Sequence, residues 1–322
     1  MLHFTTDDLR PQDRFDHWCE VRGKHLFGVT IEVPRERRTA FEGHFLSTPV
    51  GDAGIAASVS ELRASSYRVS RTRADIARVA GQSLCIGLQV RGPGWVSSGR
   101  DEGRPVREGD LVVHHADLPF EATPMRGDGF DFRSLRIPLA PGMLLGARAD
   151  DLFAAPLART AAFARPLLAL FRALTTRPGE LANAGAEVVN AVRLTLLARG
   201  RLAPGLPESR AALRSGLLHA AREILQRDLR RPELSPSNVA RELGISLRQV
   251  HVLFEPTGHS FARTLTALRL ADASRQLAVA PERSVTDIAY RSGFDSLATF
   301  YRAFRAAYAM TPGDARALAG PS

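Results

Sequence analysis

One pattern of residues occurs twice in the last third of the chain. "SPSNVARELGISLRQVHVLF" covers residues 235–254 and "SVTDIAYRSGFDSLATFYRAF" covers residues 284–304. Each copy has a serine that can cap a helix, a branched residue followed by alanine, and then a glycine suited to end that helix. An apolar residue, a second serine and a second amphipathic stretch follow in both copies. The repeat therefore predicts two helix-turn-helix units, at about 235–254 and 284–305.

The ends of the predicted helices are marked by particular residues. Pro236 stands directly after a capping serine, at a helical position where its missing N–H costs nothing. Ser284 begins an S-x-x-D sequence with the spacing of a capping box. Gly244 and Gly293 are expected to adopt the positive φ that ends a helix. A plain helical bundle is the alternative, but two matched copies in a basic region favour the repeated motif.

The segment between the two copies predicts one long helix. "SFARTLTALRLADASRQLAV" has apolar residues at helical spacing, while Arg263, Arg269 and Arg275 are expected to point mostly outward. A helix of that length spans roughly 25–30 Å. Successive major grooves on one face of a duplex lie ~34 Å apart. A stiff connector of this size could hold two reading helices over adjacent grooves, so that one chain covers an asymmetric site.

The positive charge of the chain is concentrated in the same region. The formal net charge is +9, and from Arg210 onward 16 arginines stand against 10 acidic residues. The guanidinium group suits phosphate recognition, because its planar donors match the phosphate oxygens. The charge distribution therefore supports a nucleic-acid partner.

Several classes of protein are not supported by the sequence. Cys19 and Cys85 stand far apart and form no CxxC pair, so we expect free thiols in a reducing compartment. No apolar run of 18 residues occurs and the first residues lack an apolar leader, so we expect a cytoplasmic protein with no membrane partner. GxSxG, HExxH and P-loop motifs are missing. We therefore expect a protein that is not an enzyme and needs no cofactor.

The N-terminal part changes pattern from helical to extended. Residues 1–30 look helical, with Phe15, Trp18, Cys19 and Arg22 at helical spacing. From residue 41 to 138, short alternating runs are broken by Gly and Pro, which indicates a β-sandwich or barrel. In "SLCIGLQVRG" one face is predicted to carry Leu84, Ile86, Leu88 and Val90, and the other Cys85, Gly87, Gln89 and Arg91.

The rest of the chain is predicted to be helical. Residues 141–205 are rich in Ala and Leu at spacings of three and four, and "RGRLAPGLPESR" is the best linker candidate. We therefore expect an α+β multidomain chain. Its parts are a β-rich domain with flanking helices at 1–140, a helical connector at 141–205, and an all-α domain at 210–318.

From about Leu217 to Arg316 the chain resembles the DNA-binding domain of AraC/XylS-family bacterial transcriptional regulators. The segment "SVTDIAYRSGFDSLATFYRAFRAAYAMTP" carries most of the likeness, and Ala309 departs from it where a glycine is usual. The N-terminal part is similar to the cupin-like β-barrel ligand-binding domain of one branch, through "RFDHWCE", "YRVSRTRADIA", "LQVRGPGWV" and "REGDLVVHHADLPFEA". The resemblance implies a sequence-specific regulator that binds double-stranded DNA and responds to a small-molecule effector. Contact with RNA polymerase and a homodimer are further expectations.

The resemblance also implies which residues face DNA, because the second helix of each unit leads into the major groove with its N-terminal residues. They are Ser246, Arg248, His251 and Val252 in the first unit, and Ser296, Leu297, Ala298, Thr299, Tyr301 and Arg302 in the second. Arg248 could bond bidentately to guanine, or could instead contact a phosphate. Ser235, Ser284 and Arg305 are expected to contact phosphates.

The barrel interior is the expected effector pocket. Its candidate residues are Arg71, Arg73, Gln89, Trp95 and Arg136, and the identity of the effector stays open. His114 and His115 suggest a metal site at first sight. Consecutive residues of a regular strand point to opposite faces, however, so both cannot face inward, and no metal is expected.

Two alternatives for the whole chain stay open. One is a cupin-type metal-dependent enzyme with an appended DNA-binding module, and the other is a constitutive DNA-binding protein whose barrel only dimerises. The middle helices at Leu167–Leu174 and Val188–Leu196 could form a dimer surface, or could pack against the barrel within one chain. Whether the protein activates or represses transcription is not decided by the sequence.

Overall fold

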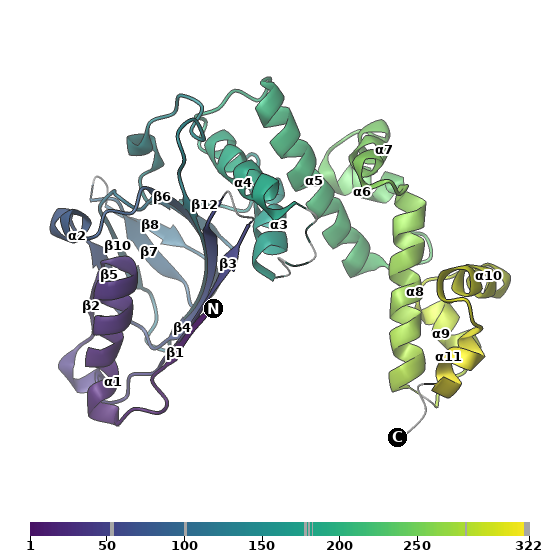
Figure 1. Cartoon of the computed structure of the whole chain (residues 1–322), viewed down its shortest axis with the longest axis horizontal. Coiled ribbons are helices and arrows are strands. Elements are labelled where there is room, and N and C mark those ends of the chain that lie inside the picture. Colours follow the sequence, from purple (N-terminus) through teal and green to yellow (C-terminus); the bar gives the residue numbers. More distant parts are fainter. Residues whose placement is uncertain are drawn as a thin grey trace. The chain divides into compact units, whose positions relative to one another are not determined.

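The computed structural model describes residues 1–51, 55–99, 102–176, 179, 181, 183–280 and 282–318. The chain divides into two compact units, Met1–Gly216 and Leu217–Ser322. The first is built mainly of strands and the second of helices (Figure 1). This confirms the α+β multidomain prediction.

The first unit contains two antiparallel sheets. The larger sheet has the order β1 (Leu2–Thr5), β3 (Gly43–Val50), β4 (Ala57–Ala64), β11 (Phe130–Pro138), β6 (Ser83–Arg91), β9 (Leu111–His115) and β12 (Ala155–Leu157). The smaller sheet has the order β2 (Thr30–Glu32), β5 (Arg68–Arg71), β10 (Phe120–Pro124), β7 (Gly94–Ser97) and β8 (Arg104–Val106). The alternating runs of the sequence thus form the expected cupin-like strands.

The predicted faces of β6 are correct at the start of the strand and wrong at its end. Leu84 and Ile86 are fully buried and Leu88 is nearly so, but Val90 is 47% exposed. The reason lies in the pairing, because β9 accompanies β6 only as far as Leu88, opposite Leu111. Gln89, expected on the opposite face, is also buried, so both faces of this strand are covered for much of its length.

Helices flank the sheets of the first unit. They are α1 (Pro11–Trp18), which continues as a π-helical segment (Cys19–Phe27), α2 (Arg73–Arg78), α3 (Ala164–Thr176) and α4 (Ala184–Ala198). Short 3-10 turns lie at Arg35–Arg37 and Ala149–Leu152. The prediction that residues 1–30 are helical is wrong at the beginning, where Leu2–Thr5 forms a strand against β3.

The middle helices belong to the core of the first unit. Leu167 and Leu170 of α3 and Val192 of α4 are fully buried, in one cluster with Leu84 and Ile86 of the large sheet. These apolar faces were one candidate for a dimer surface, and that interpretation is wrong. Because they are already covered within the chain, the alternative of packing against the barrel holds.

The elements that the structure describes in the second unit are all helices. It contains α6 (Pro236–Leu243), α7 (Leu247–Phe254), α8 (Phe261–Val279), α9 (Val285–Arg291), α10 (Leu297–Tyr308) and α11 (Pro312–Leu318). A short 3-10 turn, Glu255–Thr257, follows α7. The helix α5 (Pro207–Asp228) begins in the first unit and ends in the second.

The long helix α8 takes part in two separate cores. Its first half contributes Phe261 and Leu265 to a cluster with Val250 and Phe254 of the first helix-turn-helix. Its second half contributes residues to another cluster, formed with the second helix-turn-helix: Leu270, Ala273 and Leu277 pack with Ile288, Phe294, Phe300 and Phe304. Each helix-turn-helix therefore has its own core, and the predicted linker helix is shared between them.

The end of α10 contains a backbone conformation that its residue does not favour. Ala309 has φ 56° and ψ 18°, and its N–H bonds to the carbonyl of Arg305. Alanine in this left-handed region carries a steric cost that glycine avoids. We expect Ala309→Gly to stabilise the second unit by about 0.5–1 kcal/mol, net of the greater chain entropy of glycine when unfolded. Scanning calorimetry of the full chain measures this as a higher transition temperature.

A matched control lies on the same helix. Ala306 is exposed and within the regular part of α10, so Ala306→Gly should cost about 1 kcal/mol. If both substitutions destabilise to the same extent, the left-handed conformation at Ala309 is not the source of strain.

Candidate nucleic-acid interface and effector cavity

Capping side chains set the beginning of both predicted reading helices. In α7 the Ser246 hydroxyl accepts from Gln249 N at 3.1 Å, and Ser246 N donates to Gln249 Oε1 at 2.8 Å. In α10 the Ser296 hydroxyl accepts from Thr299 N at 3.4 Å. Gly244, with φ 67°, makes the turn that separates α6 from α7. The structure thus places α6 and α7 within 236–254, and α9 and α10 within 285–308, close to the limits predicted from the repeat.

The outward faces of the reading helices carry most of the predicted residues. Arg248 and His251 are exposed on α7, and Val252 is half-buried. On α10 the exposed residues are Ala298, Thr299, Tyr301, Arg302 and Arg305. Leu297 differs from the expectation, because it is half-buried and packs against the core around Phe300.

Arginines on these outward faces differ electrostatically from those of the scaffold. Within the described part of the chain, Arg248, Arg302 and Arg305 have no carboxylate partner within 4 Å. Five other arginines of the unit are ion-paired, and their partners are Glu242 for Arg227, Asp272 for Arg230 and Arg275, Glu233 for Arg231, and Asp287 for Arg291. Positive charge without a carboxylate partner is thus present where a phosphate backbone or a guanine edge would meet the reading helices.

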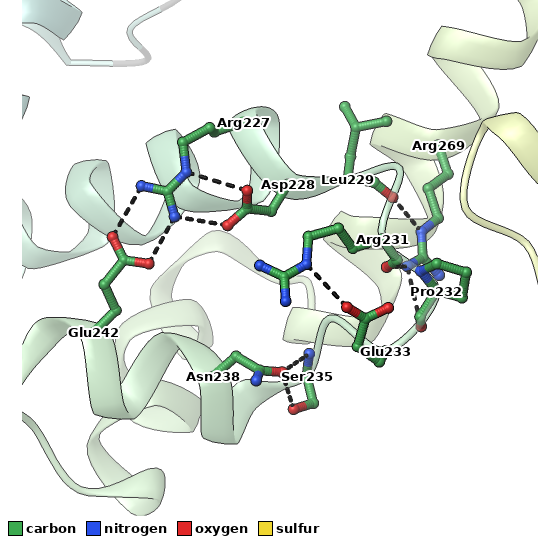
Figure 2. A network of polar contacts seen from close by, with 10 residues as sticks. All are labelled: Arg227, Asp228, Leu229, Arg231, Pro232, Glu233, Ser235, Asn238, Glu242 and Arg269. Atoms are coloured by element: carbon green, nitrogen blue, oxygen red, sulfur yellow. Dashed lines mark hydrogen bonds and ion pairs between the residues drawn. The ribbon is translucent and has the colours of Figure 1, made fainter.

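The two predicted phosphate-binding serines have different surroundings. Ser284 is exposed, and its hydroxyl accepts from Asp287 N at 3.0 Å at the beginning of α9. Ser235 is half-buried, and both its N–H and its hydroxyl donate to Asn238 Oδ1, at 2.9 and 2.6 Å (Figure 2). The donors of Ser235 are therefore already in use.

The segment that joins α5 to α6 is held by two arginines. Arg227 of α5 reaches Glu242 of α6 through two contacts of 2.7 and 3.0 Å (Figure 2). Arg269 of α8 donates to the carbonyl of Leu229 at 2.8 Å and to that of Arg231 at 2.7 Å. Arg269 was expected to point outward, and this is wrong because its guanidinium is used to hold the backbone of 229–232.

A buried carboxylate continues this network into the second helix-turn-helix. Asp272 is 3% exposed and accepts from Arg230 Nη2 at 3.0 Å and from Gln276 Nε2 at 2.7 Å. Ser292 of the second turn donates to the same carboxylate at 3.4 Å. Burial by itself would raise the pKa of Asp272, but these hydrogen bonds and the charges of Arg230 and Arg275 hold it below the ordinary value. The carboxylate is thus ionised and links the 229–232 segment to the second reading unit.

The two motif glycines have different environments. Gly244 has open space where a Cβ would be, whereas a Cβ on Gly293 would lie 2.3 Å from the carbonyl oxygen of Leu229. Gly293 also has φ +89°. The turn of the second helix-turn-helix therefore packs directly on the backbone that follows α5.

A cavity of about 190 Å³ lies between the two sheets of the first unit. Four of the five predicted effector residues line it, namely Arg71, Gln89, Trp95 and Arg136. Arg73 does not, because it is exposed at the beginning of α2.

Arg71 lines the cavity but is part of the scaffold. Its guanidinium donates to the carbonyls of Phe27, Gly28, Val79 and Ala116 at 2.5–2.6 Å. With these donors used, Arg71 orders the surrounding loops, and the expectation that it contacts an effector is not favoured by this geometry.

The adjacent histidines point to opposite sides of β9. His114 lines the cavity, while His115 is 6% exposed and accepts from Asp117 N at 3.1 Å. Across the residues that the structure describes, no group of three or more His, Cys, Asp or Glu side chains could hold a metal ion. In the same residues, no helix has the length and apolar character needed to cross a membrane.

Arg22 and Tyr67 are among the polar residues of the cavity that were missed from the sequence. The available signal was an arginine on the otherwise apolar face that Phe15 and Trp18 share in the first helix. Helical spacing placed Arg22 on the inner side, but nothing in the pattern showed that a cavity lies there.

Similarities to known proteins agree with both halves of this description. A family described as "Helix-turn-helix domain" matches residues 239–317, and the "AraC-like ligand binding domain" family matches residues 61–187. The transcriptional activator NphR of Rhodococcus sp is 25% identical over 324 residues, covering 92% of this chain and 87% of NphR. The HTH-type transcriptional regulator GlxA of Rhizobium meliloti is 37% identical over 123 residues, covering 36% of this chain and 37% of GlxA.

Among solved structures, the AraC-like transcriptional activator CuxR aligns over 90% of this chain and 100% of its own, with 19% identity and a TM-score of 0.49. Paired helix-turn-helix units with exposed reading faces, attached to a β-rich domain, define a DNA-binding transcriptional regulator. The matched families agree with this class, since residues 61–187 are similar to an AraC-like ligand-binding domain and residues 239–317 to a helix-turn-helix domain.

Proposed function

We propose that this regulator reads its operator with α7 and α10 in two major grooves of one duplex. The observation that carries this proposal is the presence of arginines without carboxylate partners on the outward faces of both helices. The helix α8, with 19 residues, is about 28 Å long, which is close to the groove spacing of ~34 Å. Arg248 and Arg302 are the proposed base-reading residues, and Arg305 a phosphate contact.

The first unit is proposed to control DNA binding in the cytoplasm through a small-molecule effector held between its sheets. The cavity and the match to an AraC-like ligand-binding family support this assignment. Activation is the proposed direction, since NphR is named a transcriptional activator, and it would require contact with RNA polymerase. Homodimer formation remains part of the proposal, through a surface other than the buried faces of α3 and α4.

Replacement of the proposed base-reading arginines should change sequence preference. Arg248→Ala and Arg302→Ala should each cost about 1–3 kcal/mol on the preferred duplex and relax specificity at one or two base pairs. Arg305→Ala should instead weaken binding to all sequences alike. It should also make the slope of log K against log salt concentration shallower by about one. Selection of duplexes in vitro, followed by affinity measurements at several salt concentrations, separates the two kinds of contact.

Arg291→Ala provides the matched control, because Arg291 is exposed but ion-paired with Asp287 on α9. It should keep the site preference of the parent. If Arg248→Ala and Arg302→Ala also keep it, the assignment of the base-reading residues is wrong.

A further inference from the structure

The polar groups of the cavity in the first unit are not paired with one another. Tyr67 is 4% exposed and lines the cavity; its hydroxyl has the Trp18 side chain as a neighbouring donor, but finds no acceptor for its own proton among the described residues. Nε and Nη1 of Arg22 find no hydrogen-bond partner among the described residues, and its guanidinium lies 5.2 Å from the centre of the Phe27 ring and 5.5 Å from that of the Tyr67 ring. Buried donors without acceptors are costly, so these two side chains favour a ligand that carries an acceptor.

The lining of the cavity carries positive charge and no carboxylate among the described residues. Arg22, Arg71 and Arg136 line it, and no Asp or Glu is among the described residues that do so. Arg71 has Asp117 at 3.8 Å outside the lining, whereas the hydrogen bond of Arg136 within the described part of the chain is a 3.5 Å contact with the carbonyl of Leu26. Burial raises the pKa of Cys85 to about 11, so its thiol adds no negative charge. Burial, with the nearby arginines, lowers the pKa of His114 to about 4, so the imidazole is neutral at pH 7.

The remainder of the cavity is apolar and aromatic. Its wall includes Phe27, Phe45, Phe120, Phe130 and Phe132. An apolar protein cavity of ~150 Å³ is sufficient to hold benzene, so about 190 Å³ suits a body of roughly one ring or a short alkyl chain. Inorganic anions would leave these aromatic surfaces uncovered.

We propose that the cavity binds a compact organic carboxylate, with its anionic group on Arg22 and the Tyr67 hydroxyl and its apolar body against the phenylalanines. This assignment rests on the proposed function, because it names the chemical class of the effector. A carboxylate accepts from both donors at once, and a charge-assisted hydrogen bond in a dry site is stronger than a neutral one. The assigned role of Arg22 is recognition of the ligand and not support of the fold.

The experiment compares matched carboxylates and amides on the full chain. The probes are benzoate with benzamide, hexanoate with hexanamide, and acetate, which has the charge without the body. At least one of the two larger carboxylates should bind about tenfold to a hundredfold more tightly than its amide, by calorimetric titration at pH 7. Acetate should bind much more weakly than either.

Variants of Arg22 test whether its guanidinium recognises the carboxylate of the ligand. Arg22→Gln should abolish the preference for the carboxylate, and Arg22→Lys should retain part of it. Arg73→Gln, at an exposed position outside the cavity, should behave as the parent. Without ligand, the transition temperature of Arg22→Gln should not fall, because the substitution removes a charge with unpaired buried donors.

Three results would overturn the proposal: amides that bind as well as the carboxylates, an Arg22→Gln variant that keeps the preference, or a set of probes in which no carboxylate binds. DNA binding by the same preparation is measured in parallel. If the operator is bound while the carboxylates are not, the assigned ligand class fails and the DNA-reading function stands. If a carboxylate binds but never alters operator affinity or transcription, the ligand class stands and effector control fails.

Discussion

Gly293→Ala is expected to destabilise the second unit by about 3–5 kcal/mol, whereas Gly244→Ala should cost only about 1–2 kcal/mol. Both glycines have positive φ, at +89° and +67°, so both substitutions carry the conformational cost of a left-handed alanine. Only at Gly293 does the new Cβ also meet a backbone carbonyl, that of Leu229, at 2.3 Å. A carbonyl cannot turn aside as a flexible side chain can, so the 229–232 segment has to move.

Urea unfolding of the two variants, followed by the helical circular dichroism signal, measures this difference directly. DNA affinity should also fall more in Gly293→Ala than in Gly244→Ala, since displacement of 229–232 disturbs the contacts of Arg269 and Arg230 as well. Equal destabilisation by the two substitutions would mean that the close packing at Gly293 does not exist in solution.

Asp272→Ala is expected to cost about 2–4 kcal/mol, because it removes a buried carboxylate that accepts several hydrogen bonds. The arginines that pair with Asp272 are more than half exposed, so they can turn to water when the carboxylate is lost. Gln276 and Ser292 are buried at 7% and 0% exposure, and they would be left without this acceptor. Asp287→Ala is the matched control, since that carboxylate is exposed and pairs with Arg291 within one helix. Its loss should lower the free energy of unfolding by about 0.5 kcal/mol.

The same carboxylate should make stability depend on pH. The folded pKa of Asp272 lies below its unfolded value of about 3.8, so its contribution is fully present above that value. It is lost as the pH falls below 3.8 through the folded pKa. The difference in unfolding free energy between the parent and Asp272→Asn should therefore be large at pH 7 and shrink toward pH 2–3. A difference that stays constant over this range would contradict the pairing.

Local features of the second unit could be predicted because they depend on residues close in sequence. Ser246 and Gln249 form their capping box within one turn, and the repeat gave both glycines a common backbone role. That role was right at both positions, yet it could not show that one glycine is packed and the other open. Leu229 is more than 60 residues from Gly293, and such a contact leaves no periodicity in the sequence.

The residues that line the cavity could be predicted less well from the sequence. Alternation assigns residues of a strand to two faces, but β6 is buried on both, so the pattern does not say which face borders a cavity. Arg71 and Arg73 are two positions apart, and one is buried while the other is exposed, because β5 ends at Arg71 and α2 begins at Arg73. Arg22 comes from a helix that precedes the strands, and its place in the cavity depends on how that helix packs on the sheets.

Because α8 is fixed near its beginning by Phe261 and near its end by Leu277, its length sets the angle between the two reading helices as well as their separation. One residue inserted into α8 would turn the second helix-turn-helix by about 100° around the axis of α8. The same insertion would move that motif only ~1.5 Å along the axis. Under the proposed reading of two grooves, changed side chains on α7 and α10 would alter the preferred bases, whereas each residue added to α8 would also turn α10 away from its groove. The spacing between the two halves of the operator would therefore be set by α8.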